Sequence, residues 1–593
     1  MRHLLLSVTL LAGPAAAQAP RADVFEKSIV ELQASLTAGR VSSVELVDAY
    51  LARIAAYDAG GPALNSMLRR NPKARAEAAR LDGERKAGRV RGPLHGIPVV
   101  LKDNFTTIDM PTSAGSLGLA GLVTPDEGPI VARLREAGAI VIGKTNMHEL
   151  AAGITSISSL GGQTRNPYDP RRCPGGSSGG TGVAVAASFA AVGWGSDTCG
   201  SIRIPAAYNS LFGLRPTQGL VSRTGVIPLS HTQDIAGPLA RTMMDLAIAL
   251  DVSVGYDPAD SSMAVVRDQP PPRFVEALRA ASLRGIRFGV LTNYLRDADL
   301  DIRDTVRSAL AVMKAGGAET VDVTIPQFDS LLAGTGVINF ETKFDLIDFL
   351  DAVPNPPVGS IRELLEQGLY HDAMNLRFHR IDSVSSRDSA PYLAALAKRT
   401  VLRDRLVALL DSLKLDALVY PTMQRRPVLI GDPQGGGTCQ LSAHSGLPAL
   451  AAPAGFTADG LPVGIELIGR PFADTKLVAI AGAFEAAGSR RKPPAFTPKL
   501  VGGKAPAPTS FTATARSTGG VAAGSFRFDP SRGELRYDVR VNGVPAEAVQ
   551  AVVLRRGNGA RPGSVIHRFI GPGELRRSGD LVLTGLDRDA LEE

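Results

Sequence analysis

Two glycine- and serine-rich segments in the first half of the chain most strongly constrain its fold. The first reads Gly175-Gly176-Ser177-Ser178-Gly179-Gly180, and the second reads Gly195-Ser196-Asp197-Thr198-Cys199-Gly200-Ser201. Glycine permits positive φ and lets backbone N–H groups approach a ligand closely, which is how an oxyanion can be stabilised beside a nucleophile. Upstream, the apolar run Val99 to Leu101 ends at Lys102. Because burial lowers the pKa of a lysine, the three segments predict a serine hydrolase with a lysine base.

These segments also carry a family resemblance. The run from Gly161 to Pro205 resembles the amidase signature family, whose members hydrolyse carboxamides with a Ser–Ser–Lys triad. The resemblance implies that Ser201 is the nucleophile, that Ser177 is the bridging serine at a cis peptide bond, and that Lys102 is the general base. It extends from about residue 25 to about residue 488.

The same resemblance implies an oxyanion hole and its support. The hole would consist of four backbone N–H groups, those of Thr198, Cys199, Gly200 and Ser201. Supporting roles would fall to Ser178, Asp197 and Arg203, and residues 163–166 would line the substrate side. At position 199 the family usually has Gly or Ala. Cysteine there keeps the backbone donor, but its larger side chain could narrow the loop.

Alternating apolar runs and helical patterns predict an α/β fold. We expect strands at 99–101, 139–144, 286–291, 319–323, 415–420 and 464–468, with helices at 130–137, 183–192 and from 302. Such alternation implies βα units in a sheet with helices on both faces. Together with the resemblance, it predicts a large mixed central sheet covered by helices in an amidase domain at 22–488.

The C-terminal part of the chain has a different composition and a different hydrophobic pattern. A Pro/Gly-rich linker is expected at 489–509, so residues up to about 490 should fold and hydrolyse amides alone. Period-two alternation at 525–529 and 535–541, with a turn at 530–533, predicts a small antiparallel β domain at 510–593. This domain resembles the chordin-type (CHRD) β domain of secreted proteins. Where that family often has histidines in a glycine turn, this chain reads Leu554-Arg555-Arg556-Gly557.

The N-terminus indicates export. Arg2 and His3 precede an apolar run from Leu4 to Leu11, and Ala15 to Ala17 supply small residues before a cut. This is the pattern of a signal peptide at 1–17, cleaved after about Ala17, so we expect a periplasmic or secreted protein. No later stretch is long and apolar enough for a membrane span. A net charge of +7 with no basic run makes nucleic acid an unexpected partner.

Cysteines, histidines and acidic residues form no pattern of a metal or cofactor site. The three cysteines are Cys173, Cys199 and Cys439. A bridge between Cys173 and Cys199 is conceivable, although buried thiols are the commoner case. His95, His148 and His231 lie in the amidase part without an acidic partner at a suggestive spacing. We therefore expect no metal and no cofactor.

Two other interpretations of the first glycine loop fail. Gly175 to Gly179 fits the G-x-S-x-G pattern of α/β-hydrolases, but that pattern requires a strand directly before the serine. The segment from Asn166 to Pro174, which contains three prolines, precedes it instead. A phosphate-binding loop is excluded because no Gly-Lys-Ser/Thr follows the glycines.

The sequence favours a secreted amidase that acts on a small-molecule or peptide amide. One alternative is an amidotransferase subunit, because enzymes that amidate aminoacyl-tRNA share the signature. Another is a non-catalytic binding protein in which the β domain matters most. The segment from Asn339 to Phe349 resembles the branch of bacterial peptide amidases, which implies C-terminal peptide amides or other linear carboxamides as substrates.

Overall fold

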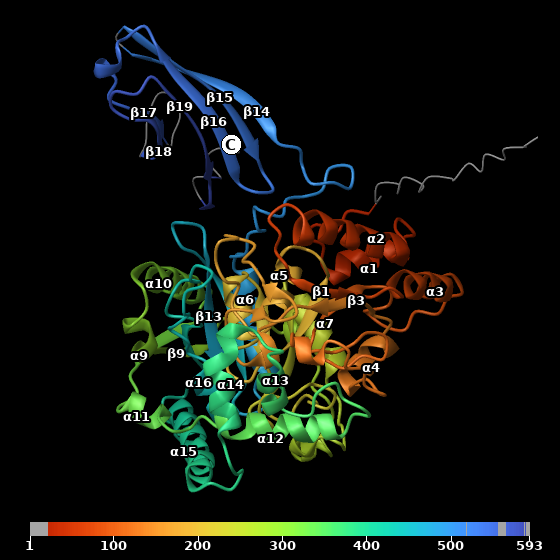
Figure 1. Cartoon of the computed structure of the whole chain (residues 1–593). Coiled ribbons are helices and arrows are strands. Elements are labelled where there is room, and N and C mark those ends of the chain that lie inside the picture. Colours follow the sequence, from red (N-terminus) through yellow and green to blue (C-terminus); the bar gives the residue numbers. More distant parts are fainter. Residues whose placement is uncertain (1–21, 518, 556–564, 586–587, 589–593) are drawn as a thin grey trace, which may run out of the picture.

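A mixed β-sheet forms the centre of the larger of two bodies. The computed structural model describes residues 22–517, 519–555, 565–585 and 588. Within these residues, eleven strands make one sheet and helices pack on both of its faces (Figure 1). The smaller C-terminal body lies above the larger one in this view.

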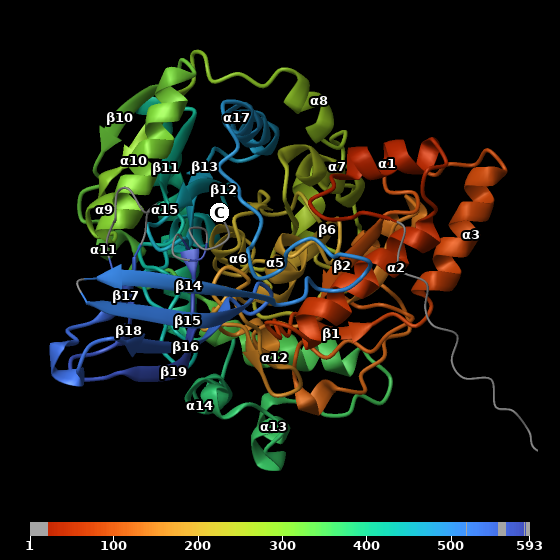
Figure 2. The same cartoon turned by 90° about the horizontal axis from the view of Figure 1, so that it is seen from above.

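The strand order of the sheet is β1-β3-β2-β6-β8-β7-β12-β13-β11-β9-β10. Figure 2 shows the sheet crossing the molecule from β1 on the right to β10 on the left. Its strands are β1 (Met67–Arg70), β2 (Pro98–Lys102), β3 (Ile140–Thr145), β6 (Val192–Ser196), β7 (Phe212–Arg215), β8 (Ala236–Ala240), β9 (Arg287–Leu291), β10 (Glu319–Val323), β11 (Ala417–Pro421), β12 (Ala449–Phe456) and β13 (Pro462–Ile468). Strands β3, β2 and β6 are parallel, as are β11, β9 and β10, and the other pairs are antiparallel. The predicted mixed α/β fold is confirmed.

The helices of the larger body are α1 (Ile29–Thr37), α2 (Ser43–Ile54), α3 (Ala74–Lys86), α4 (Pro129–Glu136), α5 (Gly179–Ala186), α6 (Arg203–Tyr208), α7 (Met243–Ser253), α8 (Phe274–Arg279), α9 (Thr292–Arg296), α10 (Leu300–Ala315), α11 (Phe328–Leu332), α12 (Ile338–Asp351), α13 (Ile361–Gln367), α14 (Asn375–Asp382), α15 (Ala390–Ser412), α16 (Gln440–Ser445) and α17 (Asp474–Ala486). A two-stranded ribbon pairs β4 (Ile157–Ser158) with β5 (Gly162–Gln163). None of the described helices has the length and apolarity needed to cross a membrane.

One helix prediction needs correction. The apolar run at 183–192 was expected to form a single buried helix, but α5 ends at Ala186 and Val192 already belongs to β6. The chain leaves the helix at Ser188, whose φ of 55° is left-handed. An apolar run buried on all sides shows no periodicity that separates a helix from a strand, so the sequence pattern could not place this boundary.

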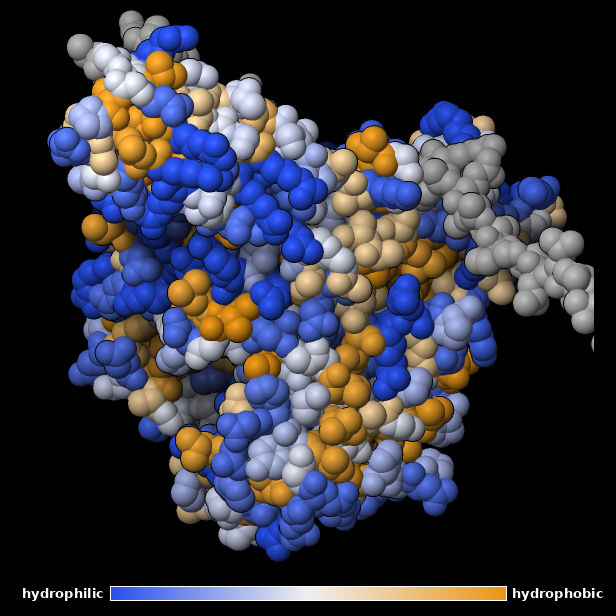
Figure 3. Space-filling model, turned by 45° about the horizontal axis from the view of Figure 1, so that its top comes forward, coloured by the Kyte–Doolittle hydropathy of each residue, from blue (hydrophilic) through white to orange (hydrophobic). Residues whose placement is uncertain are grey.

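The C-terminal body is a small antiparallel β structure, as predicted. Its four-stranded sheet contains β14 (Thr509–Ser517), β15 (Gly520–Asp529), β16 (Glu534–Asn542) and β19 (Arg576–Val582), and a second ribbon pairs β17 (Val552–Arg555) with β18 (Val565–Ile570). Aromatic residues such as Phe528, Tyr537 and Phe569 form its core. Figure 3 shows an apolar patch on this body within a largely hydrophilic surface. The CHRD resemblance stays a prediction, and Arg556 and Gly557 of its turn lie outside the described residues.

The segment predicted as a linker is attached to the larger body over its first half. Thr497 is buried, and Tyr168 donates a hydrogen bond to the Lys492 carbonyl at 2.6 Å. The buried guanidinium of Arg53 donates to the carbonyls of Thr497 (2.8 Å) and Pro498 (3.0 Å). The segment therefore completes the packing of the larger body. The predicted signal peptide at 1–17 lies outside the described residues.

These contacts predict where the chain can be shortened. A chain that ends after Ala505 keeps the acceptors of Arg53 and should fold and retain turnover. A chain that ends after Arg490 removes those acceptors from a buried cation, so its free energy of unfolding should fall by about 1–3 kcal/mol. Denaturant unfolding of both chains checks this. Failure of the longer chain to fold would mean that the two bodies depend on each other.

Candidate active site

The predicted base lies at the end of a central strand. All five residues of β2 are buried, and β2 pairs in parallel with β3 on one side and β6 on the other. Leu101 is opposite Trp194 in this register, so the carboxyl ends of β2 and β6 lie together. Lys102 and Ser196 are therefore neighbours, and the Lys102 amine does not contact bulk solvent, with 0% of the residue exposed.

The Lys102 amine is surrounded by serine oxygens. Its Nζ lies 2.7 Å from Ser177 Oγ, 2.8 Å from Ser196 Oγ and 3.3 Å from the Ser196 carbonyl. Burial lowers the pKa of Lys102 from its ordinary 10.5 to about 7, although Asp234 and Asp197 oppose the shift. A neutral amine has two N–H groups and one lone pair. If Ser196 accepts both N–H groups, the lone pair faces the Ser177 hydroxyl, which is the geometry of a base.

The loop that carries Ser177 packs closely against its surroundings. Its Gly176–Ser177 peptide bond is cis, as the family resemblance implies. The Ser177 carbonyl accepts the His148 N–H at 3.0 Å, and the Ser178 N–H donates to the Ser201 carbonyl at 3.2 Å. A Cβ on Gly180 would lie 2.2 Å from the Asn146 carbonyl, so only glycine fits there. The two serine loops are thus joined directly through Ser178.

A buried carboxylate organises the loop that carries Ser201. Asp197 accepts the N–H of Gly200 at 2.7 Å and that of Ile202 at 3.2 Å. It also pairs with Arg203 at 3.0 Å and Arg215 at 3.2 Å, and all three side chains are fully buried. Burial opposes its ionisation, but the two arginines outweigh that effect and hold the pKa of Asp197 below its usual range. Asp197 and Arg203 therefore contact each other, and Asp197 also binds the backbone of this loop; their supporting role stays a prediction.

The backbone donors of this loop are not equivalent. Gly200, one of the four predicted oxyanion donors, already gives its N–H to Asp197. The N–H groups of Thr198, Cys199 and Ser201 donate to no other residue in the described part of the chain. These three N–H groups therefore stay the candidates for the predicted oxyanion hole.

Several partners of the site come from distant segments that the sequence did not reveal. Thr198 donates its hydroxyl to Asp234 and accepts the Gln233 side chain at 3.0 Å through its carbonyl. Arg203 also pairs with Glu466 of β13. Ser196 could have been noticed, because it directly precedes Asp197 at the end of an apolar run. Asn166, which was expected near the substrate, is buried and donates to the carbonyls of Cys173 and Tyr208.

The cysteines pair differently from the conceivable bridge between Cys173 and Cys199. Cys199 forms a disulfide with Cys439, and Cys173 is a free, buried thiol. Cys439 lies 240 positions further along the chain and directly precedes α16. Spacing along the sequence could not identify this pair, because the fold alone brings the two segments together.

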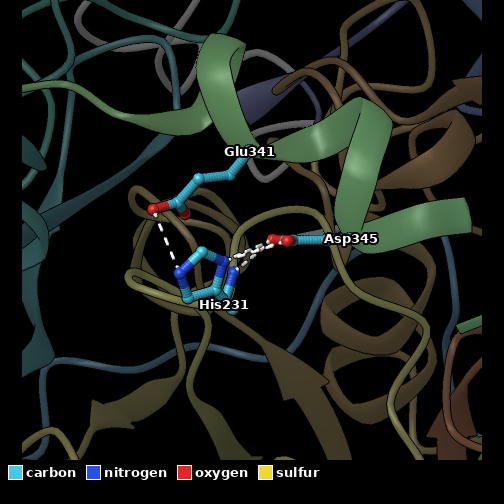
Figure 4. A group of neighbouring side chains, drawn as sticks. All are labelled: His231, Glu341 and Asp345. Carbon is cyan, nitrogen blue, oxygen red and sulfur yellow. Dashed lines mark hydrogen bonds and ion pairs between the residues drawn. The ribbon is translucent and has the colours of Figure 1, made fainter. Parts of the chain in front are cut away.

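One histidine has acidic partners, contrary to expectation. His231 Nδ1 lies 2.9 Å from Asp345 Oδ1, and its Nε2 lies 3.6 Å from Glu341 Oε1 (Figure 4). The hydrogen bond to Asp345 raises the pKa of His231. The ligand atoms of the three residues lie within 4.8 Å of one another, a metal-like grouping that sequence spacing did not suggest. The Glu341 oxygens, however, already accept hydroxyl groups, including that of Tyr392 at 2.7 Å.

The other two histidines lack the bonds of a catalytic relay. His148 Nδ1 lies 3.2 Å from the Ser156 N–H, and burial lowers the pKa of His148 to about 3. The His95 ring lies 3.0 Å from the Leu81 carbonyl, and burial lowers its pKa as well. Lys102 is therefore the titratable side chain that contacts Ser177.

The comparisons with known proteins place this site in a family. A family model described as Amidase matches residues 45–478, which is more than half of the chain. The chain belongs to the amidase family. The peptide amidase of Stenotrophomonas maltophilia is similar in structure, with a TM-score of 0.75 and 38% identity over 79% of this chain and 98% of that one.

Other relatives of this amidase-family chain carry different names. An amidase family protein from Bacillus anthracis has a TM-score of 0.72 and 33% identity, covering 79% of this chain and 92% of its own. A glutamyl-tRNA(Gln) amidotransferase subunit of Rhodopirellula baltica is 34% identical over 499 residues, which is 79% of this chain and 98% of the relative. The family match ends before the C-terminal β body begins.

The state of Lys102 predicts a pH profile for amide turnover. Because only the neutral amine can accept a proton, kcat/KM should rise about tenfold per pH unit below about 7 and level off above it. Lys102→Ala should lose about 10²–10⁴-fold in kcat and lose this rising limb. The measurement is kcat/KM against pH for both proteins.

His231→Gln is the matched control for this profile. The pKa of His231 is raised, and the imidazolium loses its charge as the pH rises through that pKa. Activity that depended on the charged pair with Asp345 would therefore fall with rising pH, whereas activity that depends on neutral Lys102 rises. The variant should keep the rising limb. If the rising limb of the pH profile disappeared in His231→Gln and remained in Lys102→Ala, His231 and not Lys102 would be the base.

Proposed function

We propose that the protein is a secreted amide hydrolase that converts linear carboxamides to carboxylates and releases ammonia or an amine. The observation that supports this most is the 2.7 Å contact between Lys102 Nζ and Ser177 Oγ at a fully buried lysine with a pKa of about 7. Such a lysine can act as a base near neutral pH without a histidine or a metal. Membership of the amidase family agrees with amide chemistry.

The proposed mechanism is a proton relay with a covalent intermediate. Neutral Lys102 takes the proton of the Ser177 hydroxyl while Ser177 takes that of Ser201, whose oxygen attacks the amide carbon. The ammonium of Lys102 then returns a proton through Ser177 to the leaving nitrogen, and the C–N bond breaks. Water repeats the relay on the acyl-enzyme, which releases the carboxylate and frees Ser201.

Backbone dipoles would stabilise the tetrahedral intermediate. The N–H groups of Thr198, Cys199 and Ser201 are the donors of choice, because the N–H of Gly200 already serves Asp197. Removal of one oxyanion donor typically costs about 10²–10³-fold in kcat. By binding the N–H groups of Gly200 and Ile202, which flank Ser201, Asp197 would hold the backbone that carries these donors.

The proposed substrates are C-terminal peptide amides and related linear carboxamides. The 38% identity to the Stenotrophomonas peptide amidase supports this choice. The segment from Asn339 to Phe349 lies in α12, which contacts residues 229–234, and Gln233 and Asp234 of that stretch bind Thr198. Thr342 of α12 donates to the Leu229 carbonyl at 2.8 Å, and Ser230 donates to Glu341. The segment that resembles peptide amidases therefore contacts the same stretch, residues 229–234, that binds Thr198 of the predicted oxyanion hole.

Export is part of the proposal. The N-terminal pattern at 1–17 is that of a signal peptide, and the Cys199–Cys439 disulfide suits an oxidising compartment. Disulfides rarely persist in the cytosol of mesophiles. Periplasm or extracellular space would therefore be the place of activity.

A second candidate function is that of an amidotransferase subunit. Its support is the 34% identity to the glutamyl-tRNA(Gln) amidotransferase subunit over most of that protein. A protein of this kind would work with partner subunits, whereas a hydrolase would act alone. A non-catalytic binding role receives less support, since Lys102, Ser177 and Ser201 are all present at the buried site.

A panel of amides tests the proposed function. The purified protein alone should release ammonia from peptide amides, and Ser201→Ala should abolish this because the attacking oxygen is gone. Ser177→Ala should lower kcat by about 10²–10⁴-fold, since the proton relay is interrupted. Enzyme-coupled ammonia detection with single-turnover controls gives the rates.

Ser360→Ala controls for loss of a serine hydroxyl elsewhere, because Ser360 only caps α13. It should keep wild-type kcat. Wild-type rates in Ser201→Ala would refute the assignment of the nucleophile. Ammonia release that appears only when partner subunits are supplied would favour the amidotransferase alternative.

A further inference from the structure

We propose that the disulfide between Cys199 and Cys439 positions the loop from Asp197 to Ser201, called the oxyanion loop below. The enzyme would then reach its full turnover rate only when this bond is formed. The inference rests on the proposed amide hydrolysis. It assigns a positioning role to Cys439, a residue outside both serine loops, and makes the thiol state of the protein a control on its activity.

The oxyanion loop has a separate tether at each of its first three residues. Asp197 is fixed by two buried arginines. Thr198 is fixed through its hydroxyl and its carbonyl by Asp234 and Gln233. Cys199 is fixed by its bond to Cys439. No other side-chain bond of Cys199 exists in the described part of the chain, so the disulfide is its direct tether, in addition to the hydrogen bonds of Thr198 and Gly200 on either side.

The other end of the disulfide is firmly anchored. Cys439 is buried, and its carbonyl accepts the Ala443 N–H at 3.0 Å at the start of α16. The preceding Thr438 donates its hydroxyl to the carbonyls of Thr422 (2.8 Å) and Pro421 (3.1 Å) at the end of β11. The crosslink therefore ties a loop of the predicted site to a fixed point of the central sheet.

Cys439 also packs against the residue between Cys199 and the nucleophile. Gly200 has a φ of 87°, and a Cβ there would lie 2.9 Å from Cys439 Cβ and 2.7 Å from Ile204 Cδ1. Arg203, which braces Asp197, reaches the Cys439 carbonyl at 3.4 Å. Release of Cys439 would thus loosen the packing around both Cys199 and Gly200.

The chemistry of the switch is thiol–disulfide exchange. A dithiol reductant gives two electrons and two protons to the bond, which leaves two thiols and oxidises the reductant to its own disulfide. Cys199 is partly exposed, and reduction requires that a small thiol reach its sulfur. A thiol–disulfide oxidant of the kind found in oxidising compartments reverses the step. The enzyme would be least active where thiols stay reduced and most active after export.

The test compares oxidised and reduced full-length enzyme on one accepted peptide amide. Treatment with dithiothreitol should raise the number of free thiols from one to three per chain. Along with this, kcat should fall about tenfold while KM changes little, because a loosened oxyanion donor weakens the transition state more than the bound substrate. Reoxidation with glutathione disulfide should restore kcat.

Variants separate this role from a general effect on folding. Cys439→Ser should have the kcat of the reduced enzyme and no response to dithiothreitol, whereas Cys173→Ser should keep the full response because that thiol is unpaired. Hydrogen exchange over residues 198–201 should be faster in reduced enzyme and in Cys439→Ser than in oxidised enzyme.

An unchanged kcat in enzyme with three free thiols would overturn the inference, as would unchanged exchange at 198–201. Absence of turnover on every amide in both thiol states would count against the proposed function instead. In that case the exchange comparison still decides whether the disulfide positions the loop.

Discussion

The contact between a buried lysine amine and a serine hydroxyl is the interaction on which the rest of the site depends. Lys102 is 0% exposed, and burial brings its pKa from 10.5 to about 7. That shift corresponds to a free energy on the order of 5 kcal/mol against the charged amine. The fully buried strand β2, covered on both sides by parallel neighbours, creates this environment. The central sheet thus supplies the chemistry as well as the scaffold.

The loop that carries Ser201 depends on a buried group that stays charged, whereas Lys102 is a buried group that is neutral. Asp197 stays ionised while fully buried because Arg203 and Arg215 lie against it and two backbone N–H groups donate to it. A neutral amine and a charged carboxylate are therefore held within one buried region by different partners. The first can accept a proton, and the second keeps the oxyanion donors in place. Such division of roles by environment is a common feature of active sites.

Local pattern predicted much of the fold, and together with the family resemblance it named the residues of the candidate site. The strand ending at Lys102 and the glycine loops around Ser177 and Ser201 were evident because strand burial and glycine conformation are local properties. The end of α5 was missed because a fully buried apolar run has no periodicity. Cys439, Asp234 and Glu466 were also missed, since they meet the site only after the sheet brings distant segments together. His231 shows the same limit, with partners on a helix more than a hundred positions away.

The protonation state of Lys102 tests the account most directly. Lysine labelled with ¹³C at Cε gives an NMR signal that shifts when the amine titrates, and comparison with Lys102→Met assigns the signal. We expect a titration midpoint near pH 7 for this lysine in the folded enzyme. A midpoint near the ordinary value of 10.5 would mean that Lys102 is an ammonium at neutral pH, which would contradict its role as the base.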